Sequence, residues 1–440
     1  MKASRRRTAA SWSVLGFLLV LLLSASQVTA QKTKVVFATP HAPTGAPERV
    51  EYFLRDNPNI EVEIVSLSGM SVNQQREFIL TMIASGQQID VVRIGGDILN
   101  EWVNAGILLD MTPYVEALGA DILGDMHPFA RNAVTKNGRI YALPEDSTSQ
   151  WALVNTGNFA KAGLESPFSI YESGAWTWDK MVEAAEKLKA LDQPNLPFFP
   201  IATLLRHPIG ITTWIMGGGG DLFNETGTEV LVNSPESLQG IEFAVGLIER
   251  GLMNSVDNMP PGLEIYAHDR WGIAPLDVTF PSWLNANAPG TEFDVIPMPQ
   301  SPFTDRDMPV HTNGYVVISR TPDPDAAMRL ALWLSGPEHY TLALTGAAHP
   351  DQPYRFSWSS SYRSSDQLFI DIVSERLGIE GLKYYREVLP RLRNYTYANN
   401  AAPNAWNEAY AALDDVWRGL RSPAAGLEEL EQRLQNLIRN

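Results

Sequence analysis

Beyond residue 32 the chain alternates short apolar stretches with amphipathic ones. Continuous or alternating apolar residues predict strands at 35–38, 60–64 and 90–94. Apolar residues at helical spacing predict helices at 47–55, 74–85 and 99–105. Pro47 suits the first position of the first helix, and Gly86 ends the second. The order β-α-β-α-β indicates an α/β fold with a mostly parallel sheet covered on both faces.

The last third of the chain has an almost entirely helical pattern. Its final helix is capped by Ser422 and has Pro423 in its first turn, and another helix starts near Thr177. Short strands recur at 294–296 and 315–318. The 440 residues suffice for two or three domains, yet no internal repeat or Gly/Ser-rich linker separates them. We therefore expect interleaved domains, with the chain crossing between them more than once.

The first 30 residues have the pattern of an export signal. A basic start containing Arg5, Arg6 and Arg7 precedes an apolar run over 14–23, and small residues lead up to Ala30. The apolar run is shorter than the roughly 20 residues that span a bilayer, so cleavage is favoured over a membrane anchor. We expect a chain beginning at Gln31 that is soluble outside the cytoplasm.

The amino-acid composition argues against several classes of function. The net charge of −16 gives a surface that repels phosphate, which argues against nucleic-acid binding. The absence of cysteine excludes disulfides, thiolate nucleophiles and zinc–cysteine sites. It also excludes a lipid anchor on an N-terminal cysteine.

Catalytic and metal-binding signatures are also missing. No two of the seven histidines have the spacing that places two metal ligands on one helix face, and there is no G-x-S-x-G motif. The glycines at 217–220 are not followed by Lys-Ser or Lys-Thr, so they form no phosphate loop; they indicate a backbone bend or a close approach of ligand. Adjacent carboxylates such as Glu145 and Asp146 cannot face each other across a cleft as a glycosidase requires. We expect no catalytic residue, metal or cofactor.

Aromatic residues are abundant, with 12 Trp, 14 Tyr and 16 Phe. Trp333, inside an apolar helical run, is predicted to be core. Five others stand beside polar loop residues: Trp151, Trp214, Trp283, Trp358 and Trp406. A sugar needs such surroundings, because its C–H faces stack on rings while its hydroxyls both donate and accept hydrogen bonds. In a parallel sheet, ligands bind at the loops that follow the carboxyl ends of the strands. In this chain those loops are 39–47, 66–72 and 94–98.

From residue 33 to its end the chain resembles the extracellular solute-binding proteins of ABC importers, the family that includes maltose-binding protein. The resemblance lies in the order and spacing of several stretches. These are DVVRIGGDILNEWVNAGILLDMTPYV at 90–115, NGRIYALPEDSTSQWALVNTGNFAKAGL at 137–164 with the following WTWDKMVEAAEKL, FDVIPMPQ at 293–300, NGYVVISRTPDPDAAMRLALWLSGPE at 313–338 and AWNEAYAALDDVWRGLRSPAAGLEELEQRL near the C-terminus.

The resemblance implies two α/β lobes joined by a hinge, with ligand in the cleft between them. The expected division is 1–30 signal peptide, 31–145 and 312–352 N-terminal lobe, 146–311 and 353–440 C-terminal lobe, with crossings near 144–149, 309–313 and 347–357. A ligand that contacts both lobes only when they are closed drives closure, and a permease recognises the closed form. Relatives from Gram-positive bacteria usually carry a lipidated cysteine, and its absence here implies a protein free in a periplasm.

Ten ligand-binding residues follow from the resemblance: His41, Thr44, Asp97, Thr148, Gln150, Trp214, Asp277, Thr279, Asn313 and Trp406. Asp97 is expected to accept protons of sugar hydroxyls and Trp406 to stack on the ring. The alternatives are an N-cap for Asp97, core packing against Tyr410 for Trp406, and loop or capping roles for the five loop residues. Relatives often carry charged residues where this chain has Thr148 and Gln150.

The expected function is therefore capture of a neutral sugar or oligosaccharide for an ABC permease, by a monomer that is not an enzyme. One alternative is a binding protein for glycerol 3-phosphate or another small solute, which would require Arg93 or Arg206 in the cleft. Two further alternatives are a secreted carbohydrate-active hydrolase and a sensory binding protein. Loss of affinity on replacing Asp97 would indicate a binder, and loss of rate an enzyme.

Overall fold

The computed structural model describes residues 32–117, 121–193, 196–224, 227–259, 263–347, 358–395 and 402–439, so the expected export signal lies outside the described residues. Within these ranges no helix combines the length and the apolar character needed to cross a bilayer. The side chain of Thr44 is also not described.

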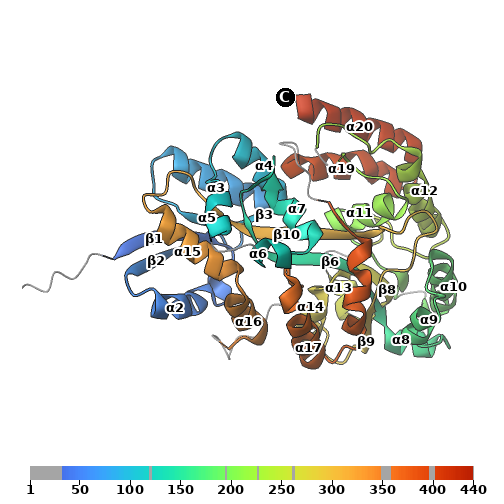
Figure 1. Ribbon diagram of the computed structural model, residues 1–440. Helices are drawn as coiled ribbons and strands as arrows, with labels where there is room; N and C mark the ends of the chain where they lie inside the picture. Colours follow the sequence, from blue (N-terminus) through green and yellow to red (C-terminus); the bar gives the residue numbers. More distant parts are fainter. Residues whose placement is uncertain are drawn as a thin grey trace, which may run out of the picture.

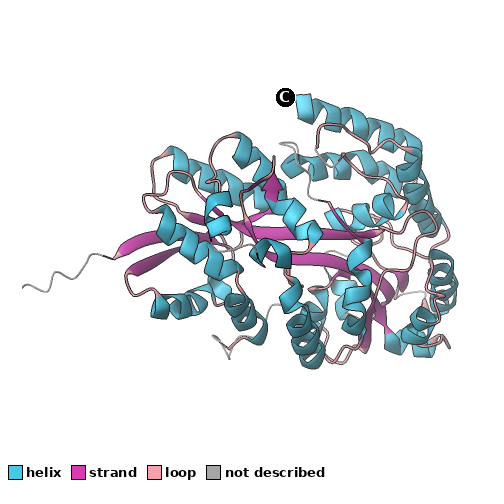
Figure 2. Cartoon of the chain, viewed as in Figure 1, coloured by secondary structure: helices cyan, strands magenta, loops and turns pink. Residues whose placement is uncertain are grey.

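One large mixed sheet runs through the molecule (Figures 1 and 2). Its described strands follow the order β2-β1-β3-β10-β6-β8-β7, with β11 beside β10 and β9 beside β6. The bounds are β1 Thr33–Thr39, β2 Ile60–Ser66, β3 Val91–Gly95, β6 Leu143–Asn155, β7 Phe199–Ile201, β8 Trp271–Asp277, β9 Phe293–Ile296, β10 Met308–Val317 and β11 Leu392–Asn394; β4 Thr135–Lys136 and β5 Arg139–Ile140 form a separate hairpin.

The first three strands are parallel, as predicted, but the prediction of a mostly parallel sheet is wrong at its centre. β1 pairs in parallel with β2 and β3, whereas β10 is antiparallel to both β3 and β6, and β6 is antiparallel to β8 and β9. The physical reason is that β6 carries the chain from one lobe to the other and β10 carries it back, so they run in opposite directions side by side (Figure 1).

Helices cover the sheet in both lobes. Around the first part of the sheet lie α2 Ala46–Asp56, α3 Val72–Ala84, α4 Gly96–Asn104, α5 Thr112–Ala117, α6 Asp121–Asp125, α7 Pro128–Val134, α15 Pro324–Ser335 and α16 Pro337–Thr345. The remainder are α8 Thr156–Lys161, α9 Pro167–Glu172, α10 Trp178–Leu188, α11 Pro208–Gly217, α12 Pro235–Glu249, α13 Glu264–Ala267, α14 Phe280–Asn287, α17 Asp366–Leu377, α18 Tyr385–Val388, α19 Ala402–Trp417 and α20 Pro423–Arg439. The predicted helical C-terminal region is confirmed, and β11 is a short exception.

Local sequence explains where several helices begin. Ser71 and Gln74 form a reciprocal capping box at the start of α3. Thr177 accepts a hydrogen bond from the Lys180 amide at the start of α10, and Ser422 accepts one from the Ala425 amide, 3.3 Å away, at the start of α20. In each case a hydroxyl oxygen satisfies an N–H group that has no partner within its helix.

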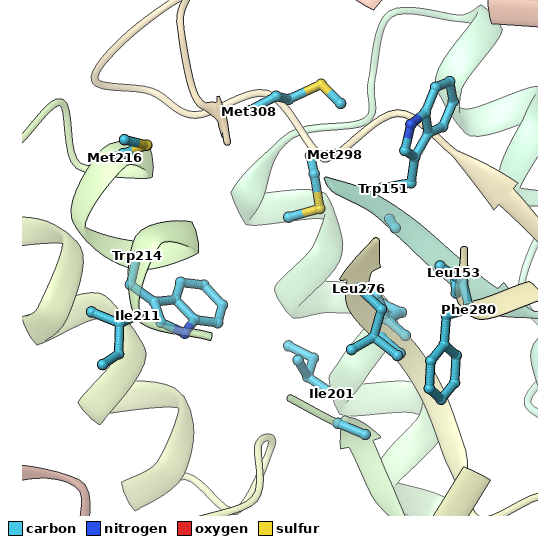
Figure 3. Packing of buried hydrophobic residues seen from close by; sticks show 14 of the residues in the cluster. Trp151, Leu153, Ile201, Ile211, Trp214, Met216, Leu276, Phe280, Met298 and Met308 are labelled. Atoms are coloured by element: carbon cyan, nitrogen blue, oxygen red, sulfur yellow. The ribbon is translucent and has the colours of Figure 1, made fainter. Parts of the chain in front are cut away.

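Two separate hydrophobic cores define the two lobes. One contains residues of β1, β3, α4 and α15, including Trp102, and Trp333 packs against it half-buried. The other contains residues from the rest of the chain, including Trp151 and Trp214, which Figure 3 shows on β6 and α11. Side chains of α7 and α16 also enter this second core, although the predicted division places both helices in the N-terminal lobe. That exact division stays a prediction.

A third segment runs beside the two crossing strands. The Ser147 amide donates to the Ser359 carbonyl at 3.0 Å, and Asp146 forms a bridge with Ser360. The Ser147 hydroxyl also contacts Thr312 at 3.1 Å and Ser361 at 2.9 Å. Of the predicted third crossing at 347–357, residues 348–357 lie outside the described part of the chain.

Candidate ligand-binding site between the lobes

A cavity of about 340 Å³ lies where the two lobes meet. Strand β3 and helices α3 and α4 supply one wall, the crossing strands β6 and β10 supply the floor, and segments around 207–209, 277–279, 358, 395 and 406 supply the other wall. Helix α4 of one lobe contacts α19 of the other. A ligand in this cavity would therefore touch both lobes and the strands that join them.

Asp97 enters the cavity from the N-terminal lobe in the first turn of α4. This helix begins at Gly96 with Gly95 as its N-cap, so the alternative that Asp97 is the N-cap is wrong. A Cβ atom on Gly95 would lie 2.8 Å from Asp97 Oδ1 and 3.6 Å from His311 Nε2. Glycine at this position lets the carboxylate lie close to the backbone where strand becomes helix.

The floor of the cavity is a network of paired charges. Arg93 Nε lies 2.8 Å from Glu145 Oε2, and Arg93 Nη2 lies 3.0 Å from Asp146 Oδ2. Burial lowers the pKa of Arg93, but the charges of these two carboxylates more than offset it, so its pKa is raised. Burial raises the pKa of Glu145 and the Arg93 charge opposes it; the Tyr315 hydroxyl also donates to this carboxylate. Arg93 is thus held by protein carboxylates rather than left for a ligand.

The network continues along β10. Asn313 Nδ2 donates to Asp146 Oδ1 at 2.9 Å, and His311 Nε2 lies 2.8 Å from Asn313 Oδ1. Thr148, on the neighbouring strand, donates to the same Asp146 oxygen at 3.3 Å. Because His311, Asn313 and Thr148 all line the cavity, this floor presents imidazole, amide and hydroxyl groups of fixed orientation.

Aromatic rings dominate the wall of the C-terminal lobe. Trp406 and Tyr395 meet edge-on with ring centroids 5.7 Å apart, and Tyr395 lies 5.4 Å from the His311 ring. Trp358 also lines the cavity and lies 4.9 Å from His41, ring to ring. Burial, followed by the charges of Asp277 and Asp97, raises the pKa of Tyr395 well above its usual range. Its hydroxyl therefore stays protonated and can donate or accept a hydrogen bond.

Asp277, Thr279 and His207 complete this wall. Asp277 Oδ1 accepts hydrogen bonds from the Thr279 amide, at 2.8 Å, and hydroxyl. His207 is the N-cap of α11, and its Nδ1 accepts from the Ile209 amide at 3.3 Å. Burial lowers the pKa of His207, which Asp277 opposes and His311 reinforces, so the imidazole is neutral at neutral pH.

The structure brings together six of the ten residues expected to bind ligand. The lining residues are Asp97, Thr148, Asp277, Thr279, Asn313 and Trp406. His41 does not line the cavity but packs on Trp358, which does. Trp406 is also packed against Tyr395 and is 8% exposed.

Two of the ten lie away from the cavity. Gln150 is buried, and its Nε2 donates to the Thr213 hydroxyl and to the Pro275 carbonyl. Trp214, shown among buried residues in Figure 3, is 1% exposed and packs against Trp178 and Phe243. The side chain of Thr44 lies outside the described residues.

Sequence reasoning did not single out His207, His311 or Tyr395. Apart from His41, the histidines carry no sequence signal beyond the lack of metal spacing, although His311 stands two residues before Asn313 and so shares its face of the strand. Within the described ranges no group of three or more His, Asp or Glu side chains could hold a metal ion. Tyr395 directly follows the three-residue strand β11, a signal too short to read from the sequence.

The glycines at 217–220 serve packing between helices. A Cβ on Gly218 would lie 2.2 Å from the Glu236 carbonyl, and one on Gly240 would lie 1.9 Å from the Trp214 carbonyl. Gly219 has φ +93° and makes the bend that the sequence predicts. None of the four lines the cavity, so the alternative of close ligand approach finds no support here.

A second hollow, of about 470 Å³, lies on the C-terminal lobe. It is lined by 177–179 and 300–305 alone. Because both segments belong to one lobe, a ligand there would not contact both lobes.

Comparisons with known proteins give the family. The sequence pattern of the family described as bacterial extracellular solute-binding protein matches residues 38–340. Among solved structures, an ABC substrate-binding protein from Listeria monocytogenes in complex with cycloalternan is 18% identical, with a TM-score of 0.74 over 92% of this chain and 98% of that one. The sugar-binding protein MalE from Xanthomonas citri is 17% identical, with a TM-score of 0.76 over 92% and 98%.

The GacH receptor of Streptomyces glaucescens is 14% identical, with a TM-score of 0.73 over 93% and 99%. These likenesses establish the two-lobe binding-protein fold. No curated protein sequence matches the chain significantly. The match of the family pattern to more than half of the sequence shows that the chain belongs to the bacterial extracellular solute-binding proteins.

Proposed function

We propose that this protein captures an uncharged sugar or oligosaccharide outside the cytoplasm and delivers it to an ABC permease. The observation that carries the proposal is the lining of the cavity between the lobes. It combines the rings of Trp358, Tyr395 and Trp406 with hydroxyl, amide and carboxylate groups. Rings offer the flat apolar surfaces on which sugar C–H faces stack, and the polar groups match hydroxyls that donate and accept.

The charges in the cavity disfavour an anionic ligand. Arg93 is paired with Glu145 and Asp146, and Arg76 with Glu101 at 2.6 Å. Arg206, the other cation considered for glycerol 3-phosphate, is half exposed, pairs with Asp414 and does not line the cavity. A phosphate would therefore enter a cavity whose arginines already hold carboxylates.

Delivery rests on closure of the hinge. Ligand contacts from both lobes exist together only when the lobes meet, so a bound sugar favours the closed arrangement. β6 and β10 carry cavity residues Thr148, His311 and Asn313 within the strands that join the lobes. A ligand at this floor thus acts directly on the connection that must bend.

The experiment is a thermal-shift screen of residues 31–440 against mono-, di- and trisaccharides, glycerol 3-phosphate and amino acids. A ligand at 100 times its Kd adds about 2.7 kcal/mol to the free energy of unfolding. We expect a rise in Tm with one group of sugars. A rise only with glycerol 3-phosphate would contradict the proposal. If nothing raises Tm, the screen is repeated after unfolding, dialysis and refolding, which removes any ligand retained from the expression host.

A pair of variants tests whether binding occurs in this cavity. Asp97 and Asp325 occupy the same second position in their helices, α4 and α15, but only Asp97 lines the cavity. Both Asn substitutions remove the same favourable charge from a helix N-terminus. We expect Asp97→Asn to weaken sugar binding about tenfold, because hydrogen bonds to charged groups contribute roughly 1.5–3 kcal/mol, and Asp325→Asn to leave it unchanged. Equal affinities would argue against this site.

A carbohydrate-active hydrolase is the second candidate, because Asp97 and Asp277 enter the same cavity from opposite lobes. A hydrolase needs two carboxylates that face each other across the scissile bond. Incubation with the sugars that bind, followed by chromatography, separates the two functions. Unchanged sugar supports the binding protein. Product formation that Asp97→Asn abolishes would support the hydrolase.

A further inference from the structure

The two cavity carboxylates differ from the other charges around them. Among the described residues, no hydrogen-bond donor or cation pairs with Asp97, and the hydrogen bonds to Asp277 come from Thr279. The lining arginines, by contrast, are held by Glu145, Asp146 and Glu101. The described lining therefore carries negative charge that no protein cation offsets.

The two carboxylates share one part of the cavity. They enter from opposite lobes, yet the charges of both act on the hydroxyl of Tyr395. The ring of Tyr395 in turn contacts Trp406 and His311. The carboxylates and these aromatic rings thus line the same cavity. Two imidazoles also lie there: burial lowers the pKa of His207, and His311 Nε2 is hydrogen-bonded to Asn313 Oδ1.

The charge of the ligand affects how readily the lobes close, because Asp97 and Asp277 are both negative. Bringing Asp97 and Asp277 toward the same ring places like charges near each other where water is partly excluded, which is unfavourable. A ligand ammonium group would reverse the sign, because it donates charge-assisted hydrogen bonds to carboxylates and is attracted to aromatic faces. A ligand carboxylate would add a third negative charge.

Building on the proposed carbohydrate-binding function, we propose that the cavity ranks sugars by charge. A sugar with a protonated amino group binds more tightly than the uncharged sugar of the same skeleton, and the corresponding uronic acid binds most weakly. Asp97 and Asp277 set this order together, and the rings of Tyr395 and Trp406 contribute to it.

The test compares sugars that differ in one substituent. The probes are glucose, glucosamine, N-acetylglucosamine and glucuronate, with cellobiose and the chitosan disaccharide as a longer pair, plus the amino and uronate derivatives of whichever neutral sugar binds best in the screen. Affinities are measured by calorimetry slightly below neutral pH, at low and high salt. We expect the amino sugar to bind roughly tenfold more tightly than its neutral partner, and this ratio to shrink at high salt. N-acetylation removes the charge and should remove the advantage.

Variants assign the effect to the carboxylates. In Asp277→Asn the ratio of amino to neutral affinity should fall toward one, while Asp325→Asn should keep it. Amino and neutral sugars that bind wild-type protein equally, or a uronate that binds best, would overturn the ranking and leave the proposed function intact. Failure of every carbohydrate to bind would overturn both, so the two failures are distinguishable.

Discussion

Trp214 and Trp406 lie on helices of the same lobe, α11 and α19, in two different surroundings. Trp214 packs against Trp178 and Phe243 inside the core, with ring centroids 6.0 Å away in both cases. Trp406 packs edge-on against Tyr395 and lines the cavity. Their exposed fractions, 1% and 8%, hardly differ. Burial alone therefore does not separate a structural tryptophan from a candidate binding one; the neighbours do.

Substitutions in the core around Trp214 and in the cavity wall around Trp406 should therefore affect different properties of the protein. In the core, contacts around Trp214 exist whether or not a ligand is present, so they contribute to stability. Trp406 belongs to the same buried cluster as Trp214 and so also contributes to stability, but it lines the cavity as well, and under the proposed function a ligand completes its contacts, so it contributes to affinity. Substitutions should show which of these two quantities each region controls.

The largest effect is expected from Trp214→Ala. Removing a buried tryptophan costs the transfer free energy of the ring and leaves a cavity, about 3–5 kcal/mol together. We expect the free energy of unfolding in urea to fall by this amount, while the affinity of the folded protein for sugar changes less than about threefold. A loss of affinity as large as that of Trp406→Ala would contradict the division between core and cavity.

A smaller loss of stability is expected where α11 and α12 meet. A Cβ on Gly240 would lie 1.9 Å from the Trp214 carbonyl oxygen, so Gly240→Ala must push the helices apart, at about 1–3 kcal/mol. Gly246 lies on the same helix with nothing within 4 Å of its Cβ position, and Gly246→Ala should raise stability by up to about 1 kcal/mol. Urea unfolding of both variants gives the comparison, and equal changes would contradict close packing of the backbones.

Much of the fold could be predicted because it depends on local pattern. Strand alternation and helical spacing, which depend on residues close together in the sequence, predict β1 to β3 and the helices between them, and the helix starts near Thr177 and Ser422 are also found. The antiparallel pairing of β10 with β3 and β6 joins segments far apart in the sequence, and no local pattern encodes it.

The residues of the candidate site also differ in whether the nearby sequence could predict them. Asp97 is expected from the resemblance to the solute-binding family, and it lies in the first turn of α4 at the carboxyl end of β3, where parallel sheets place ligands. The opposite wall is assembled from separate segments, so Tyr395 and His207 could not be inferred from their neighbours. For Trp214 the sequence held a signal: the stretch PIGITTWIMG has no charged residue on any side, which indicates a core helix rather than a cavity wall, and the structure buries all of residues 209–217.

At the cavity the expected effect is on affinity. Trp406→Ala removes one of the two tryptophan rings of the C-terminal wall, and we expect sugar affinity to fall about tenfold to a hundredfold, or roughly 1.4–2.7 kcal/mol. Trp406→Phe keeps part of the ring and should retain most of the affinity. Titration calorimetry measures both variants. If Trp406→Ala lowers the free energy of unfolding but leaves affinity unchanged, then Trp406 is a core residue like Trp214.

The smallest effect concerns a buried histidine in the N-terminal lobe. His339 Nε2 accepts a hydrogen bond from Arg49 Nε at 3.1 Å, and its pKa lies well below 6.5 because of burial and the Arg49 charge. Below pH 6.5 the unfolded chain therefore binds a proton that the folded chain does not bind. Stability should fall as pH drops through this window toward the lowered pKa, by up to about 1.4 kcal/mol per pH unit.

His339→Gln keeps an acceptor for Arg49 but removes the titrating group, so the free energy of unfolding should depend less steeply on pH below 6.5. His268 is exposed, and His268→Gln is the matched control for replacing a histidine away from the core. Urea unfolding at several pH values measures the slopes. Because His339 lies away from the cavity, its substitution should not change sugar affinity at neutral pH, where the buried imidazole is uncharged. An unchanged slope in His339→Gln would mean that this histidine takes up a proton in the folded state, and that the surroundings of Arg49 accommodate a second positive charge.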